Sequence, residues 1–453
     1  MSLGQASDAS VRGQGAMRLS AVFGDGRLVL VGLLLAYFLA LLALSLEGGS
    51  AEAWRRFGVF SLDPSFADMR SVTSAWECAR AGIEVVPANP CDPWGRPANY
   101  PSLWLAPAFL GLGQESTAYL GVATALVFFA SFLIVIGRAR PLDGLVYAAA
   151  LCSPAVMLGV ERGNVDLLLF AVVALGVLLL RRRWVLAHGL LLAAAVLKLF
   201  PLFAWAVLAR QPRRRAVLAG GVLALALAAY VLATLGEIRA ILDAVPQETQ
   251  SSYGIAVAVD SAQELVARLE LTPLYFLTHP WAGPVGRVVL VCVGGLLGLW
   301  LARRWRARGE RVAENRHLDA FWAGAGIFCG TFALFQNYDY RLIFLLLTVP
   351  QLLCWAREAR AAVPLAGWAL AAIVATLWLG TGVPFAPLGV GEAWVDVTGW
   401  FPLEEVVNWL LLAYFAAALV VTFPQARLPA RDSERSARST EFSARRTSAA
   451  AVR

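Results

Sequence analysis

Lysine is nearly absent from this sequence. Lys198 is its only lysine, and the other basic residues are arginines and three histidines. Lys198 lies inside an apolar run, where an ionisable side chain is costly and usually has a partner. A single ammonium in an arginine-rich chain indicates a position that needs a compact point charge rather than a planar guanidinium. The alternative is chance, with the side chain extending to the lipid headgroups.

Charged residues are scarce as well. They make up 15% of the 453 residues, whereas 59% are hydrophobic, and the mean hydropathy is +0.65. A typical soluble domain carries about 25% charged residues, so the composition predicts a polytopic membrane protein. The formal charge of +7 arises from arginine clusters beside apolar segments. Such clusters are a topology signal and do not indicate nucleic-acid binding.

The sequence shows no pattern for a metal or a nucleotide. The six cysteines include no CxxC pair and the three histidines stand alone. There is no glycine-rich phosphate loop and no DxD pair. We therefore expect neither a metal nor a cofactor. Cys78 and Cys91 share one predicted outer loop, where a disulfide would persist, and the sequence leaves their pairing open.

Apolar runs that can cross or nearly cross a bilayer, about 17–25 residues each, recur along the chain. They predict an all-α polytopic membrane protein with about 10–13 transmembrane helices. A further run at 102–113 is too short to span and is expected at the membrane interface. The longer runs cover residues 28–46, 117–136, 144–160, 165–180, 185–209, 216–235, 288–302, 318–334, 342–355, 364–380 and 406–423.

Arginine clusters fix the expected orientation, because short cytoplasmic loops are enriched in positive charge. For every cluster to be cytoplasmic, the run 185–209 must enter and leave on one side, with a break near Pro201. Both termini are then cytoplasmic. The expected divisions are an N-terminal segment at 1–27, a membrane-embedded catalytic region at 28–423 and a disordered basic tail at 424–453. The expected outer segments are 47–101, 161–166, 236–287, 335–341 and 381–405.

The first outer loop, 47–101, supplies a candidate general base. Asp68 lies on a short predicted helix, and a carboxylate at the mouth of a membrane cavity is suited to accept a proton from an attacking hydroxyl. A solvated surface residue is the alternative. Asp63 precedes Pro64 and is better explained as a helix N-cap. The local sequence leaves Asp63, Asp68 and Asp92 open as the base.

The same loop ends in a stretch rich in aromatic and amide residues. Asn99, Tyr100 and Trp104 are candidates to bind a polar ligand, through hydrogen bonds or by stacking on a sugar face. Anchoring at the membrane interface is the commoner use of tryptophan in membrane proteins.

Charged and amide side chains also gather on the other outer segments. Arginine suits bidentate recognition of phosphate, so Arg162 and Arg341 are candidates to hold a phosphate together with Lys198. Structural ion pairs are the alternative. These residues are all predicted to lie on the same side of the membrane, which favours one shared binding site over several unrelated ion pairs. The substrate-binding candidates beside them are Glu161, Asn164, Asp166, Asn337 and Asp339.

One segment carries a resemblance to a known family. RGNVDLLLFAVVALGVLLLRRR, followed by AAAVLKLFPLFAWAVL, resembles the signature of polyprenol-phosphate-dependent glycosyltransferases of the GT-C superfamily, and most closely glycosyltransferase family 87. Asp68 in FADMRS matches the base expected in the first outer loop of such enzymes. Asp166 stands where asparagine is more usual, and Ser102 replaces the second proline of a Tyr-Pro-Pro-Leu motif. The matching elements of the signature are Gly163, Asn164, the basic turn 181–183, Lys198, Phe200 and Pro201.

The resemblance implies a GT-C-like bundle and an inverting transfer of a hexose. The expected donor is a polyprenyl-phosphate sugar, with mannose the first choice, and the expected acceptor is a lipid or glycan on the extracytoplasmic face. The expected location is the inner (plasma) membrane of a bacterium, in contact with membrane lipid. Asp68 is then the general base, and no nucleotide sugar or cofactor takes part.

The main alternative is a transporter or flippase of a lipid-linked or anionic substrate, because broken helices and buried charges are also transporter features. A transporter needs its charged site near the middle of the bilayer, whereas the candidates here cluster toward one face. An inactive scaffold of an envelope-glycan assembly is a third interpretation.

Overall fold

The computed structural model is built almost entirely of helices, which make up 78% of it. Short strands β1 (Ser252–Tyr253) and β2 (Asn337–Tyr338) form one antiparallel pair. The predicted all-α polytopic class is confirmed. The structure describes residues 25–244, 252–268, 270, 273–274, 279, 281–308, 310, 315–334, 337–358, 360–379 and 402–424. The predictions for the N-terminal segment up to residue 24, the tail from 425 and the loop at 380–401 fall outside these residues.

Five described helices are long and apolar enough to cross a membrane, or up to seven if each of two bent pairs is one span. The long helices are α2 (Gly26–Gly48), α5 (Thr117–Ile136), α10 (Arg213–Ala233), α13 (Ala282–Arg306) and α18 (Pro402–Thr422). Five shorter apolar helices complete the bundle: α8 (Val165–Leu179), α9 (Trp184–Leu197), η3 (Phe200–Arg210), α14 (Leu318–Leu334) and α16 (Ala366–Leu379).

Two predicted straight runs are bent in the structure. The run 144–160 is divided into α6 (Pro141–Leu151) and α7 (Pro154–Arg162), which meet at 60°. The run 342–355 is divided into η5 (Asp339–Leu347) and α15 (Val349–Arg357), which meet at 50°. Pro154 and Pro350 lie in the first turn after each bend. Proline has no N–H to continue the preceding ladder, so it favours a new helix start.

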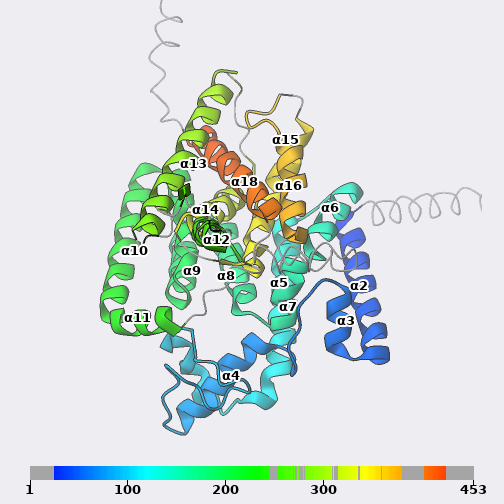
Figure 1. The fold of residues 1–453 in the computed structure, drawn as a ribbon. Helices are drawn as coiled ribbons and strands as arrows, with labels where there is room; N and C mark the ends of the chain where they lie inside the picture. Colours follow the sequence, from blue (N-terminus) through cyan, green and yellow to red (C-terminus); the bar gives the residue numbers. More distant parts are fainter. Residues whose placement is uncertain are drawn as a thin grey trace, which may run out of the picture.

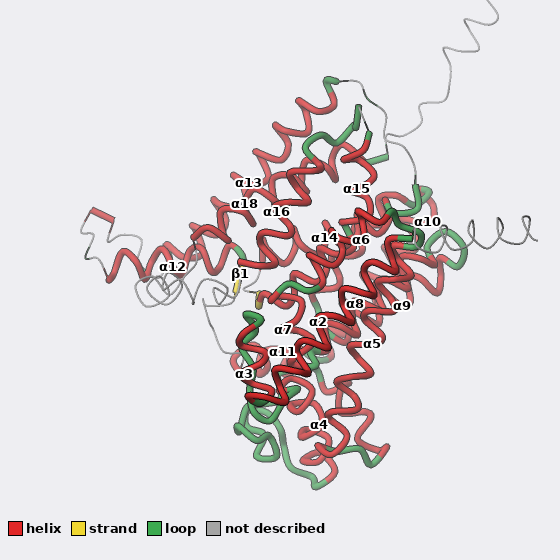
Figure 2. Tube along the Cα trace, turned by 90° about the vertical axis from the view of Figure 1, so that its right-hand side faces the viewer, coloured by secondary structure: helices red, strands yellow, loops and turns green. Residues whose placement is uncertain are grey.

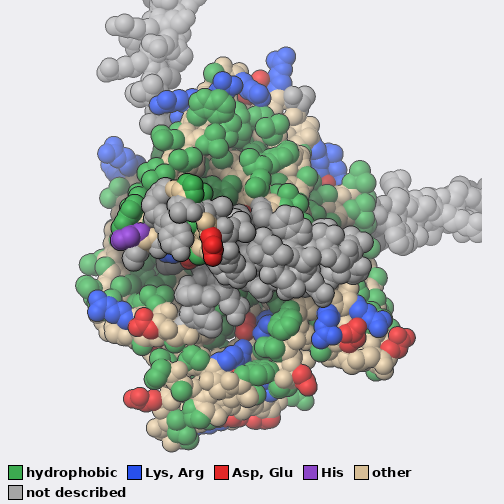
Figure 3. All heavy atoms as spheres, in the orientation of Figure 1, with side chains coloured by type: hydrophobic (Ala, Val, Ile, Leu, Met, Phe, Trp, Pro, Cys, Tyr) green, Lys and Arg blue, Asp and Glu red, His purple; other side chains and the backbone are tan. Residues whose placement is uncertain are grey.

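The outer helices leave apolar side chains uncovered by protein. Only 11% of the apolar window of α10 is buried, and only 17% for α2 and α13. Leu225 and Leu232 of α10 are each 74% exposed. Leucine exposed on this scale requires an apolar surrounding such as lipid. Figure 3 shows hydrophobic side chains covering much of the upper half of one face, with basic side chains at its top.

The interior is filled by aromatic rings on the central helices. Phe128 and Phe132 of α5 pack against Phe170 of α8, which also meets Phe344 of η5. All four are at most 1% exposed. These contacts join segments far apart in the sequence, and Figure 1 shows α8 and α14 inside the bundle with α10, α13 and α2 at its edges.

A compact unit, called the outer unit below because it lies outside the helix bundle, covers one end of the bundle. It contains α4 (Ala67–Arg80), η1 (Ser102–Leu110) and η2 (Gln114–Ser116). The helix α3 (Ser50–Arg56) packs on α2. Figures 1 and 2 both place α4 at the lower end. A disulfide joins Cys78 of α4 to Cys91, with their Cα atoms 5.9 Å apart. Asn89 Nδ2 donates to Ser74 Oγ at 3.0 Å. The pairing that the sequence left open is therefore present.

The helix α4 docks on the bundle through glycines. The Phe66 ring lies where a Cβ on Gly121 would be, at 2.5 Å. Gly163 ends α7 with a φ of 58°, and a Cβ there would lie 3.1 Å from both Met69 Cβ and Phe66. These glycines allow the first turn of α4 to approach the start of α8 closely.

We expect Gly163→Ala to lower the free energy of unfolding by about 1–3 kcal/mol, because alanine is strained in the left-handed region and its Cβ is crowded. Gly189→Ala is the matched control: it lies in α9 with no atom within 4 Å of a built Cβ, so the change is expected to be neutral or slightly stabilising. Thermal unfolding in detergent checks both. Equal transition temperatures for the two variants would contradict this account.

Candidate active site

Asp68 lies in the first turn of α4 and faces the start of α8. The backbone N–H of Phe66 donates to the carbonyl oxygen of Glu161 at 3.2 Å, which fixes the chain entering α4. Asn164 Nδ2 then donates to Asp68 Oδ2 at 2.6 Å. The Asp68 side chain keeps 18% of its surface exposed. It is thus held in place and still accessible.

Asn164 connects the Asp68 carboxylate to the backbone of Asp166. As the N-cap of α8, its Oδ1 accepts from the backbone N–H of Asp166 at 2.8 Å. The Asp166 side chain is fully buried. Its Oδ1 accepts from Lys198 Nζ at 2.7 Å, and its Oδ2 lies 3.5 Å from Arg341 Nε. Two cations therefore share one buried carboxylate.

Lys198 sits in the break between α9 and η3. Pro201 lies in the first turn of η3, so the predicted break is present. The residue at the break is extended, with φ −160° and ψ 124°. Its ammonium lies 5.3, 5.8 and 6.0 Å from the ring centres of Tyr100, Phe200 and Tyr340. Aromatic faces attract a cation, so these rings form a cage around the single lysine.

Arg341 stands on the other side of Phe200. Its guanidinium carbon lies 4.5 Å from the Phe200 ring centre, and Nη1 donates to Asn337 Oδ1. Asn337 Nδ2 in turn donates to the carbonyl oxygen of Thr331 at 2.9 Å. The side chain of Arg341 is only 12% exposed. It is a fixed cation rather than a mobile surface one.

An arginine from the loop at 47–101 also lies close to Asp68. Arg96 Nη1 lies 3.8 Å from Asp68 Oδ1. Its Nε and Nη2 donate to the two carboxylate oxygens of Asp92 at 3.2 and 2.9 Å. Asp92 Oδ1 also accepts from the backbone N–H groups of Trp94 and Arg96. The Asp92 carboxylate therefore makes its hydrogen bonds within this turn.

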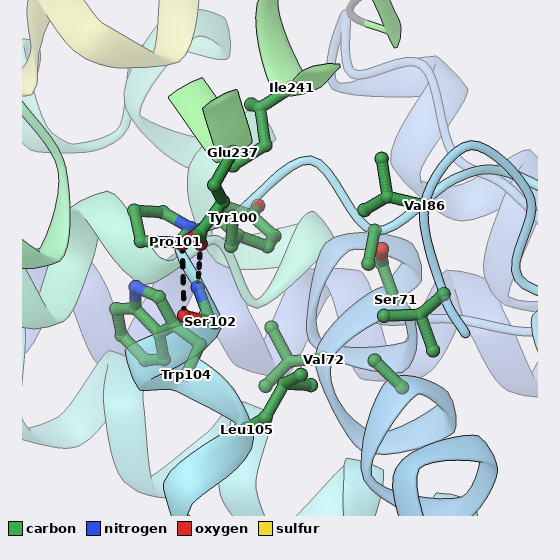
Figure 4. A pocket seen from close by; sticks show the side chains of 13 residues that line it. Ser71, Val72, Val86, Tyr100, Pro101, Ser102, Trp104, Leu105, Glu237 and Ile241 are labelled. Carbon is green, nitrogen blue, oxygen red and sulfur yellow. Dashed lines mark hydrogen bonds between the residues drawn. The ribbon is translucent and has the colours of Figure 1, made fainter. Parts of the chain in front are cut away.

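An apolar cavity of about 90 Å³ adjoins the aromatic cage. Figure 4 shows Val72 and Leu105 on its floor and Ile241 of α11 (Leu235–Ala244) above. The Glu237 carboxylate accepts hydrogen bonds from the backbone N–H and the hydroxyl of Ser102, which ties α11 to the outer unit. Tyr100 lines the cavity and also faces Lys198. Burial raises the pKa of Tyr100 well above its ordinary value, so it stays a neutral phenol.

Comparison with known proteins identifies the central part of the chain. Residues 102–318 match the family model of glycosyltransferase family 87. The matched region belongs to that family. The comparison with curated proteins and the comparison with solved structures each found no match. The resemblance drawn from the sequence is confirmed over this region, and the match indicates a glycosyltransferase. The family 87 match includes Asn164, Asp166 and Lys198, whereas Asp68 and Arg341 lie outside it.

The structure brings together most of the site residues predicted from the sequence. Hydrogen bonds, an ion pair and a cation–ring contact form one network, which contains Asp68, Asn164, Asp166, Lys198, Arg341, Asn337 and Tyr100. Trp104 joins at its edge, because Trp104 Nε1 donates to the carbonyl oxygen of Leu197 at 3.0 Å.

Other predicted residues lie apart from this network. Arg162 Nε is 3.4 Å from Glu161 Oε2, and its guanidinium lies over the Phe60 ring at 5.8 Å. Glu161 is buried and accepts from Ser61 Oγ at 2.7 Å. Asn99 is half-buried beside Tyr100. Asp339 is fully buried, and its carboxylate accepts no hydrogen bond from a described residue.

The N-cap prediction for Asp63 is wrong. The helix begins at Ala67, with Phe66 at the N-cap position in the left-handed region, and Asp63 is exposed. The docking of Phe66 on Gly121 and on the Glu161 carbonyl sets the helix start, so tertiary contact overrides the local Asp-Pro signal.

Sequence reasoning missed Arg96, Phe200 as a cage wall, and Tyr340. The spacing of Asp92 and Arg96 is a recognisable local pair, but an acid and an arginine four residues apart occur on many surfaces. Within the part of the chain that the structure describes, no group of three or more His, Cys, Asp or Glu residues is arranged to hold a metal ion.

We expect Asp166→Asn to destabilise the protein by about 3–5 kcal/mol, because it leaves two buried cations without their shared anion. The matched control is Asp260→Asn. Asp260 pairs with Arg287 at 2.8 Å on the surface, and such a pair contributes about 0–1 kcal/mol. Thermal unfolding in lipid nanodiscs measures both. Loss of equal size in the two variants would refute the shared-anion role of Asp166.

Proposed function

We propose that this glycosyltransferase moves a hexose, with mannose the first choice, from a polyprenyl-phosphate sugar to a lipid or glycan acceptor on the extracytoplasmic face. The observation that carries the proposal is the network from Asp68 through Asn164 to Asp166, Lys198 and Arg341. It links an accessible carboxylate, through Asn164 and Asp166, to two cations.

The cations suit a phosphate. Lys198 and Arg341 carry two positive charges against the single charge of Asp166, so the group keeps an excess positive charge in a largely buried setting. Such a charge stabilises the negative charge that develops on a departing phosphate. The apolar cavity beside Tyr100 suits the isoprenoid units next to that phosphate. Arg162 is not used, because it pairs with Glu161.

Asp68 is the proposed general base. The acceptor hydroxyl attacks the anomeric carbon, and its proton passes to the Asp68 carboxylate. The bond between the anomeric carbon and the phosphate oxygen breaks, and polyprenyl phosphate leaves with the electron pair. A single displacement inverts the configuration of the anomeric carbon. Asn164 orients the carboxylate, and Asp166 holds Lys198 and Arg341 in position.

The helix α8 supports the proposed orientation. Its N-terminal end carries Asn164 and Asp166, and just beyond its C-terminal end Arg181 Nε donates to Asp319 at 2.8 Å. Arg210 Nε donates to the same carboxylate at 2.7 Å. Arginine-rich ends favour the cytoplasm, so the site end faces outward. We propose a bacterial plasma-membrane enzyme with cytoplasmic termini and a catalytic region at 28–423.

The first test is transfer of radiolabelled sugar from synthetic polyprenyl-phosphate mannose by purified protein in lipid, with crude envelope glycolipid as acceptor. We expect Asp68→Asn to lower kcat by at least about 100-fold, the usual contribution of a general base, while donor binding survives. Asp63→Asn is the matched control in the same loop and should keep wild-type turnover.

Each outcome has a distinct meaning. Product from another polyprenyl-phosphate sugar, but none from mannose, keeps the mechanism and changes the sugar. Normal turnover by Asp68→Asn removes the base assignment. Movement of a lipid-linked substrate across the bilayer, with no product from any donor, would replace the proposal with transport.

A second test concerns the single lysine. We expect Lys198→Arg to lower kcat by about tenfold or more although the charge is kept, because a guanidinium is larger and differently hydrated and the aromatic cage leaves little room. Arg56→Lys on the exposed face of α3 is the control exchange and should be silent. A wild-type rate for Lys198→Arg would show that any cation suffices there.

A further inference from the structure

The turn that carries Arg96 is attached to both ends of α4. At the C-terminal end, the disulfide joins Cys91 to Cys78. At the N-terminal end, Arg96 Nη2 donates to the carbonyl oxygen of Ala67 at 2.6 Å. Asp92 is 5% exposed, and its carboxylate accepts from the guanidinium and from two backbone N–H groups of its own turn. The guanidinium is therefore fixed relative to the first turn of α4.

The two oxygens of Asp68 have different surroundings. Oδ2 accepts the hydrogen bond from Asn164 at 2.6 Å. Oδ1 lies 3.8 Å from Arg96 Nη1, which is too long for a hydrogen bond but close for two charges. No described residue donates a hydrogen bond to Oδ1. This oxygen is thus next to a positive charge and still has its lone pairs available.

We propose that Arg96 is a positioning residue that makes Oδ1 of Asp68 the proton-accepting atom. This inference rests on the proposed role of Asp68 as general base. The proton of the acceptor hydroxyl goes to Oδ1, while Oδ2 remains bound to Asn164. Asp92 holds Arg96 at a distance from which it stabilises the charge without occupying the accepting lone pair.

The planar guanidinium, with its three nitrogens, explains why this position requires arginine rather than another cation. Its Nε and Nη2 bind Asp92, the same Nη2 binds Ala67, and Nη1 points to Asp68. The guanidinium carbon also lies 4.5 Å from the centre of the Trp94 ring. A lysine has one nitrogen and cannot make these contacts together.

The test compares Arg96→Ala with wild type in the transfer assay, with and without added methylguanidinium. We expect kcat to fall about 10- to 100-fold, no more than the lower end of what a general base itself contributes, with the KM for the donor unchanged. Arg96 is 31% exposed, so methylguanidinium should enter the vacated space and restore part of kcat. Arg80→Ala is the matched control, since Arg80 binds the carbonyl oxygens of Ala108 and Leu112 on the same outer unit and should keep kcat.

Three results would overturn the inference: an unchanged kcat in Arg96→Ala, a raised donor KM at unchanged kcat, or a lowered kcat that methylguanidinium does not restore. If Arg96→Ala does not fold, Asp92→Asn provides the same comparison, because it loosens Arg96 and should lower kcat. A wild-type kcat in Asp92→Asn would also overturn the inference. Failure of the proposed function is distinct, since it would show as normal turnover by Asp68→Asn or no transfer by wild type.

Discussion

The fully buried carboxylate of Asp166 is the constraint on which the site depends. A charge removed from water is tolerated only with close partners, and here they come from two distant segments, the break after α9 and the start of η5. Their meeting brings η3 and η5 together, because Lys198 and Arg341 both lie over the Phe200 ring of η3. The ion cluster and the aromatic core are therefore two parts of one packing arrangement.

The helix α8 connects this ion cluster to the opposite end of the bundle. One end carries the Asn164 cap, which joins the Asp68 carboxylate to the backbone of Asp166. The other end leads to Asp319, whose carboxylate accepts hydrogen bonds from two arginines. Ring contacts along its length bury Phe170 between α5 and η5. Because α8 has polar contacts at both ends and apolar contacts between them, its length sets the distance between the site and the arginine-rich end of the bundle.

The sequence was informative where a residue was exceptional in its setting. A lone lysine in an apolar run and an asparagine two residues before an aspartate led to Lys198, Asn164 and Asp166. The all-α membrane class followed from the apolar runs. Arg96 was not predictable, because its role depends on a disulfide-bonded turn folding back along α4. A proline, Pro154 or Pro350, lies at each of the two bends. Because proline is also tolerated in straight membrane helices, its presence alone did not predict that these two helices would bend.

The single lysine, Lys198, also allows occupancy of the site to be measured by chemical modification. In this sequence the only other amine is that of the N-terminus, and the Lys198 side chain keeps 17% of its surface exposed within its aromatic cage. An amine-directed reagent therefore finds one side chain to modify, at the centre of the ion cluster. Shielding of that amine would record occupancy of the pocket directly, with no engineered label.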